Sequence, residues 1–135
     1  MRKLEDRGLI AATRNIRNQK VLIYQGKNDE VVRASMAKKL KEFYVRMGVP
    51  EGSIQTVYSD GNHNFPTDKS EGIGCDEAKV PYVAKCNLDL AGKILTQTLR
   101  RPLQKSAMNE QNLFKVTQDS APVSIAAYGY LYANK

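Results

Sequence analysis

The sequence predicts an α/β fold, because a strand, a helix and a second strand follow one another in its first half. Residues 21–24 (Val-Leu-Ile-Tyr) form a compact apolar run, which is typical of a strand buried on both faces of a parallel sheet. Residues 33–47 have the periodicity of an amphipathic helix, and residues 55–58 suit another short strand. This order is that of a βαβ unit, which we expect to be right-handed.

The helix of residues 33–47 has the clearest pattern. Its lysines and Glu42 fall away from the apolar stripe. We expect it to stop at Gly48, with Pro50 just beyond. The stripe consists of Met36, Leu40, Phe43, Tyr44 and Met47.

Shorter signals predict the other elements. Residues 3–12 suit a short helix, and residues 88–99 suit a longer one that Pro102 ends. Residues 113–116 and 127–132 suit strands near the C-terminus. The apolar face of the helix of residues 88–99 consists of Leu88, Ala91, Leu95 and Leu99.

Three tyrosines alternate along residues 127–132, so their phenol rings share one face of the predicted strand. Such a face suits a binding platform for an apolar polymer or a sugar. It also suits an ordinary sheet face whose phenol tips reach solvent, and this second interpretation is favoured.

Residues 59–85 follow no period. Asp60 and Gly61 begin this segment as a turn, and Pro66 and Pro81 interrupt it. A structureless segment of this length in a compact domain is usually functional or tied down.

Length and composition fit one domain over residues 1–135. Hydrophobic residues make up 41% of the chain, which excludes general disorder. No apolar run approaches the roughly eighteen residues of a membrane span, and no signal peptide follows Met1. A secreted protein would therefore carry its signal upstream of this sequence.

The net charge of +7 raises the question of a nucleic-acid partner. Part of the positive charge lies in Lys38, Lys39 and Lys41, and part lies in Arg100 and Arg101. No recognition motif or aromatic platform accompanies them, so a solvated helix face and a helix C-terminus are favoured over nucleic-acid binding.

The two cysteines, Cys75 and Cys86, allow three interpretations. A zinc site would need further ligands, and the chain has only one histidine. A nucleophilic cysteine could take His63 as its partner. A disulfide that ties the irregular segment is favoured, and it implies an oxidising compartment.

Asp29 and His63 are the candidate acid and base. Asp29 lies a few residues beyond the strand of residues 21–24, and His63 lies just beyond the strand of residues 55–58. Adjacent parallel strands would place both on one rim, where a carboxylate can orient an imidazole. Taken singly, Asp29 could be a turn former and His63 a surface residue. Asp60 and Asp68 flank His63 and are the rival acids.

No nucleophile accompanies this pair. The chain has no Gly-x-Ser-x-Gly, and none of Ser35, Ser53, Ser59 and Ser70 has a strand-to-helix elbow around it. We therefore expect the serine to lie outside this sequence.

These residues resemble the secreted poly(3-hydroxybutyrate) depolymerases, which are serine esterases of the α/β-hydrolase fold. Residues 22–32 resemble their strand and catalytic-acid turn, and His63 with Phe-Pro-Thr at residues 65–67 resembles their histidine loop. Residues 75–92 resemble their disulfide segment and the helix after it. Residues 128–132 resemble a strand that leads into a further part of the catalytic domain.

The resemblance implies a partial α/β-hydrolase sheet: a βαβ unit, a disulfide-tied loop, a helix and a C-terminal strand, with residues 103–135 leading onward. It implies that Asp29 and His63 belong to a Ser-His-Asp triad that hydrolyses hydroxyalkanoate esters without a cofactor or metal. The partners would be a polyester or oligoester substrate and the serine-bearing segment of the same protein, in a secreted or periplasmic setting. The chain alone would be inactive. The alternative is a non-catalytic hydrolase fragment that acts as a binding module.

The chain departs from the pattern of these depolymerases next to the histidine. Asn62 stands where a glycine is usual, and Asn64 stands where a small residue is common. Bulkier side chains on the rim predict narrower access to the site, which bears on polymer cleavage more than on ester chemistry.

Overall fold

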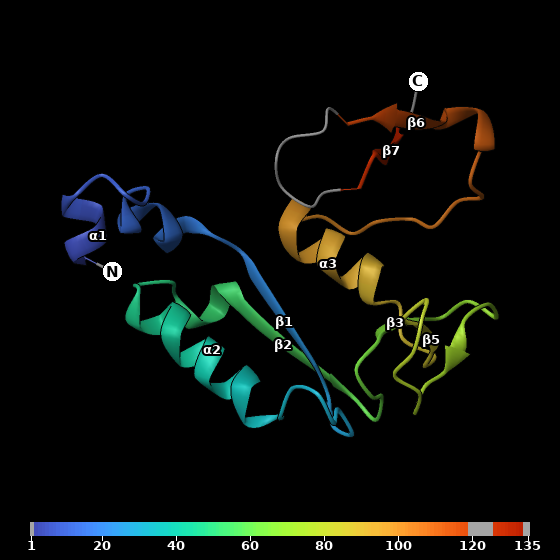
Figure 1. Cartoon of the computed structure of the whole chain (residues 1–135), viewed down its shortest axis with the longest axis horizontal. Coiled ribbons are helices and arrows are strands. Elements are labelled where there is room, and N and C mark those ends of the chain that lie inside the picture. The colour runs from blue at the N-terminus through green and yellow to red at the C-terminus, as the bar shows by residue number, and fades with distance from the viewer. Residues whose placement is uncertain (1, 119–125, 134–135) are drawn as a thin grey trace. The chain divides into compact units, whose positions relative to one another are not determined.

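The structure is a computed structural model that describes residues 2–118 and 126–133. The chain forms two compact units, Met1–Leu103 and Gln104–Lys135 (Figure 1).

A parallel strand pair forms the centre of the first unit. Strand β1 (Val21–Gly26) pairs with β2 (Ile54–Ser59), and helix α2 (Ser35–Arg46) packs against β1 (Figure 1). The predicted strand–helix–strand unit with parallel strands is therefore confirmed. The buried core consists of Val21, Ile23, Ala37, Val49 and Ile54.

Helix α2 ends where predicted, but the residues that it buries differ in part from the predicted apolar stripe. Gly48 adopts a φ of +90°, the left-handed conformation that commonly terminates a helix. Ala37 is the buried residue of α2, with Tyr44 and Val45 packed beside the core. The predicted stripe is only partly correct, because Met36, Leu40 and Phe43 are exposed.

The N-terminal segment differs from the predicted helix of residues 3–12. Helix α1 covers only Arg2–Asp6, and a 3₁₀ helix, η1, covers Thr13–Asn18. Gly8 has a φ of +67°, and its amide and that of the next residue bond back to the carbonyls of Glu5 and Leu4. This local turn stops the helix early.

The irregular segment contains a small parallel sheet that the sequence did not predict. Strands β3 (Phe65–Thr67) and β4 (Ile73–Gly74) both pair with β5 (Val83–Lys85), in the order β3-β5-β4. Strands of two or three residues are too short to show a period. The Cys75–Cys86 disulfide is present, so the prediction that this segment is tied down is confirmed.

Helix α3 (Leu90–Leu99) begins at an Asp89 cap whose carboxylate accepts a 2.8 Å hydrogen bond from the Gly92 amide. Leu90 is buried, and Gln97 donates hydrogen bonds to the carbonyls of Val21 and Ser53. The predicted apolar face was wrong. Its members Ala91, Leu95 and Leu99 are exposed, because α3 has apolar residues on both sides and turns the Leu90 side inward.

The second unit is an antiparallel hairpin. Strand β6 (Leu113–Thr117) pairs with β7 (Tyr128–Tyr132), and the 3₁₀ turn η3 (Glu110–Asn112) directly precedes β6. A similar turn in the first unit, η2 (Glu51–Ser53), directly precedes β2. Both predicted strands are confirmed. The three tyrosines of β7 are exposed, as a solvated sheet face requires.

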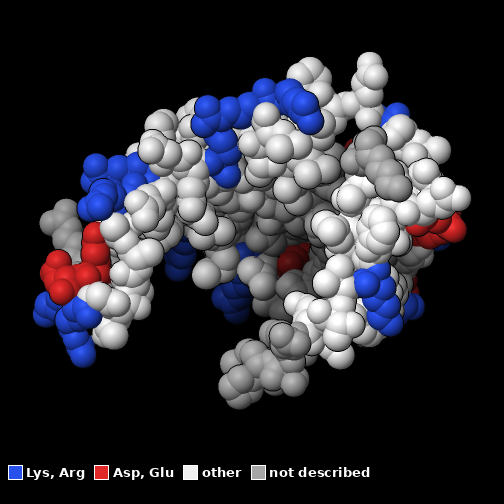
Figure 2. Space-filling model, turned by 90° about the horizontal axis from the view of Figure 1, so that it is seen from above, with Lys and Arg blue, Asp and Glu red and all other residues white. Residues whose placement is uncertain are grey.

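Two surface properties concern possible partners. Among the described residues, no helix has the length and apolar character needed to cross a bilayer. On the face shown in Figure 2, Lys and Arg side chains lie in several separate groups, some of them beside Asp and Glu.

Candidate active site

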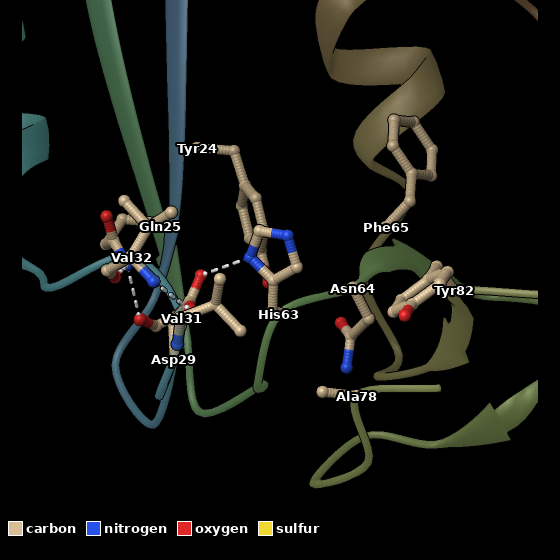
Figure 3. A pocket seen from close by; sticks show the side chains of 11 residues that line it. Tyr24, Gln25, Asp29, Val31, Val32, His63, Asn64, Phe65, Ala78 and Tyr82 are labelled. Atoms are coloured by element: carbon tan, nitrogen blue, oxygen red, sulfur yellow. Dashed lines mark hydrogen bonds and ion pairs between the residues drawn. The ribbon is translucent and has the colours of Figure 1, made fainter. Parts of the chain in front are cut away.

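The turn after β1 presents Asp29 with a fixed orientation. One carboxylate oxygen, Oδ1, accepts hydrogen bonds from the amides of Val31 (2.9 Å) and Val32 (2.7 Å). These bonds leave the other oxygen, Oδ2, to point toward His63 (Figure 3). The Asp29 side chain is only 9% exposed.

The electrostatics of Asp29 favour the ionised carboxylate. Burial raises its pKa, but the hydrogen bonds from Val32, His63 and Val31 together outweigh burial and lower the pKa below the usual aspartate value. Asp29 is therefore a carboxylate at neutral pH.

His63 lies just beyond β2, and its Nδ1 is 3.1 Å from Asp29 Oδ2. Because an ionised carboxylate can only accept, Nδ1 carries the hydrogen of this bond. The other ring nitrogen, Nε2, then has the free lone pair of the neutral ring. It points away from Asp29, toward the side where Phe65 and Tyr82 lie (Figure 3). The structure thus brings together the two residues that the sequence predicted as a pair.

Close packing of the two loops makes this contact possible. The strand register sets Gly26 opposite Ser59, and the Asn28 amide bonds to the Gly61 carbonyl at 3.1 Å. A Cβ on Gly26 would lie 2.3 Å from the Gly61 oxygen. Only glycine therefore fits where the two loops leave the sheet.

Asp29 and His63 open into a cavity of about 560 Å³. Tyr82 meets the His63 ring edge to face, with the ring centroids 6.4 Å apart. The walls are mostly apolar, which suits an uncharged organic substrate. The lining residues are Tyr24, Gln25, Gly26, Asp29, Val31, Val32, His63, Asn64, Phe65, Ala78 and Tyr82.

The sequence did not indicate that Gln25 holds the acid turn closed. Its side chain is buried and donates hydrogen bonds to the carbonyls of Gly26 (2.8 Å) and Val32 (3.0 Å), at the two ends of the turn. The available signal was a glutamine at the end of an otherwise apolar strand.

The predicted narrowing of the rim by asparagines is wrong for Asn62. Its side chain is buried and is bonded to the amide of Glu30 and the carbonyl of Asp76, so it does not narrow the rim. Asn64 does line the cavity, but its amide nitrogen is bonded to the carbonyls of Cys75 and Glu77. Both asparagines hold loops together.

The rival acid Asp60 is exposed and pairs with Lys27 at 2.9 Å on the surface. Among the hydrogen bonds of the described residues, none joins a serine hydroxyl to the His63 ring. The Ser59 hydroxyl shares a 2.7 Å bond with Tyr24, whose pKa is raised by burial, and Ser53 accepts a bond from Lys20.

The disulfide excludes a thiolate role for either cysteine, whether as nucleophile or as zinc ligand. In the part of the chain that the structure describes, no cluster of three or more His, Cys, Asp or Glu residues could hold a metal ion.

Comparisons with known proteins place the chain beside one kind of enzyme, although no family model matches it. A poly(3-hydroxybutyrate) depolymerase from Delftia acidovorans is 33% identical over 91 residues, which are 65% of this chain and 18% of that protein. The crystal structure of the PHB depolymerase from Penicillium funiculosum matches 91% of this chain and 40% of its own, with a TM-score of 0.79 and 22% identity.

A PHB depolymerase with a serine replaced by alanine, in complex with an R3HB trimer, matches the same shares of both chains, with a TM-score of 0.78 and 23% identity. At these identities the structures show a shared fold. The chain spans less than half the length of each of these proteins. The predicted resemblance to poly(3-hydroxybutyrate) depolymerases is thus confirmed in sequence and in fold.

Proposed function

We propose that this chain supplies the acid and the base of a serine esterase of the α/β-hydrolase fold, and that the nucleophilic serine lies outside it. The observation that carries the proposal is the 3.1 Å contact between His63 Nδ1 and Asp29 Oδ2 beyond the ends of adjacent parallel strands. In such enzymes the triad follows in the chain order serine, carboxylate and histidine, and Asp29 and His63 would occupy the last two places.

The reaction follows from the proton positions. His63 Nε2 takes the proton of the serine hydroxyl as its oxygen attacks the ester carbonyl. The tetrahedral intermediate collapses, and the imidazolium returns the proton to the departing alcohol oxygen, which leaves an acyl-enzyme. In the second half, His63 takes a proton from water as the water oxygen attacks the acyl carbonyl. The imidazolium then returns the proton to the serine oxygen, and the acid is released. Asp29 holds the Nδ1 hydrogen and stabilises the imidazolium in both halves.

We propose hydroxyalkanoate esters as the substrates. One structural relative holds an R3HB trimer, and the cavity beside His63 offers apolar contacts from Val31, Val32 and Phe65. An ester of a short hydroxyalkanoic acid is largely uncharged along its length, so mostly apolar walls suit it.

We also propose a secreted or periplasmic setting, which the Cys75–Cys86 disulfide favours. Thiol titration of the unfolded, unreduced protein is expected to detect no free thiols. Two free thiols would argue against this setting.

A serine-directed fluorescent phosphonate tests the triad. In the complete protein that contains this chain, we expect label on a serine outside the present sequence, and the substitution His63→Ala should abolish labelling. Label on a serine of residues 1–135 would contradict the proposed division of the triad. Undiminished labelling of the His63→Ala variant would remove His63 from the mechanism.

The second candidate function is a non-catalytic binding module, and the exposed tyrosines of β7 favour it. Tyr128, Tyr130 and Tyr132 lie on one strand face, with Lys115 above the Tyr128 ring at 3.8 Å. If this face binds polyester, Tyr130→Ala should weaken adsorption to poly(3-hydroxybutyrate) granules, whereas Leu131→Ala on the opposite face should not. Equal adsorption of all three proteins would exclude this role for the tyrosines.

A further inference from the structure

Asn62 has no part in the chemistry above, yet it is one of the few buried polar residues of the first unit. Its residue is 7% exposed. Oδ1 accepts hydrogen bonds from the amides of Glu30 (3.2 Å) and His63 (2.7 Å), and Nδ2 donates to the carbonyl of Asp76 (3.0 Å). Both ends of the amide are used, which is what burial of an asparagine requires.

The two amides bound to Oδ1 belong to the two loops of the candidate site. Glu30 directly follows Asp29, and the other amide is that of His63 itself. One oxygen atom therefore ties the acid turn to the base loop within one residue of each functional side chain.

The disulfide-tied segment holds Asn62 from behind. The Asn62 amide donates to the carbonyl of Cys75 at 2.9 Å, next to the Asp76 carbonyl that Nδ2 reaches. Its side chain thus cannot turn away without breaking bonds to three segments.

We propose that Asn62 is a positioning residue that sets the geometry of the Asp29–His63 pair. The structural part stands on the hydrogen bonds alone, and the catalytic consequence rests on the proposed function.

The test compares three variants of the complete protein on a soluble 3-hydroxybutyrate oligoester. Asn62→Ala removes the shared acceptor. Asn62→Asp keeps an oxygen for both amides, but it loses the donor to Asp76 and adds a negative charge. Asn28→Ala is the matched control, because its exposed side chain also joins the two loops, through the Asp60 carbonyl, but touches neither amide.

We expect Asn62→Ala to lower kcat by about tenfold to a hundredfold with KM nearly unchanged, since misplaced catalytic groups affect the reaction more than binding. Asn62→Asp should recover part of this loss. Asn28→Ala should change kcat by no more than about twofold. In carbon-detected NMR titrations, Asn62→Ala should also raise the pKa of Asp29, because it weakens the bond from His63.

Wild-type kcat and an unchanged Asp29 pKa in Asn62→Ala would overturn the proposal. A loss of kcat that tracks the folded fraction equally in all three variants would overturn it as well, because it would assign Asn62 a purely structural role. The Asp29 titration needs no activity. If the unsubstituted protein hydrolyses no ester, the proposed function fails while the titration still decides the role of Asn62.

Discussion

At the scale of residues, the candidate site depends on the 3.1 Å contact between His63 Nδ1 and Asp29 Oδ2. Both residues could be predicted from the sequence because each follows a strand of the predicted parallel pair, and parallel strands end at one rim. Gln25 and Asn62 could not be found in the same way. Gln25 left only the weak signal of a polar residue at the end of an apolar strand, and its role depends on burial and on the carbonyls of the turn. The role of Asn62 depends on burial and on backbone groups far along the chain, which leave no local pattern.

The lowered pKa of Asp29 predicts a stability that depends on pH. Because the folded state lowers this pKa below the ordinary value of 3.8, the unfolded chain binds more protons in the acid range, and stability rises with pH there. The contribution is complete above the ordinary value and is lost as the pH falls through the lowered pKa.

Urea unfolding at pH 7 and at pH 3 measures this effect. We expect the unsubstituted protein to lose more free energy of unfolding between the two pH values than the Asp29→Asn variant does. Equal losses in both proteins would contradict a lowered Asp29 pKa.

At the scale of elements, the longer helices and strands could be predicted from the sequence, and the strands of two or three residues could not. Strands β1 and β2, helix α2 and both hairpin strands followed from periodicity. Strands β3, β4 and β5 are stabilised by pairing with one another and by the disulfide. Their residues therefore carry no local pattern that predicts a strand. The inward side of α3 could not be chosen because both of its sides carry apolar residues.

The approach of the two site loops predicts a strong effect at Gly26. The substitution Gly26→Ala places a Cβ 2.3 Å from the Gly61 oxygen, so the loops must separate. We expect the free energy of unfolding to fall by about 1–3 kcal/mol, the usual range for overpacking.

Gly52→Ala is the matched control, because a Cβ there meets nothing within 4 Å. Its free energy of unfolding in urea should change little. If the two alanine variants were equally stable, the loops would not be as close as the structure has them.

At the scale of the whole molecule, the chain divides into two compact units at Leu103. Residues 101–109 are exposed and lie in neither a helix nor a strand.

This division predicts where a protease cuts first. Under native conditions with little trypsin, we expect early cleavage after Arg100 or Lys105, which lie at the boundary in exposed backbone. Mass spectrometry should find fragments that correspond to the two units. Early cuts confined to residues 21–99 would contradict the division.

The central claim is that Asp29 is the acid that orients His63, and paired substitutions test it most directly. In the complete protein, we would measure turnover of a soluble 3-hydroxybutyrate oligoester by Asp29→Asn and by Asp60→Asn. We predict a loss of about 10⁴-fold for Asp29→Asn, as for the equivalent change in other triads, and near-normal turnover for Asp60→Asn. Near-normal turnover of Asp29→Asn, or a comparable loss in Asp60→Asn, would contradict the account.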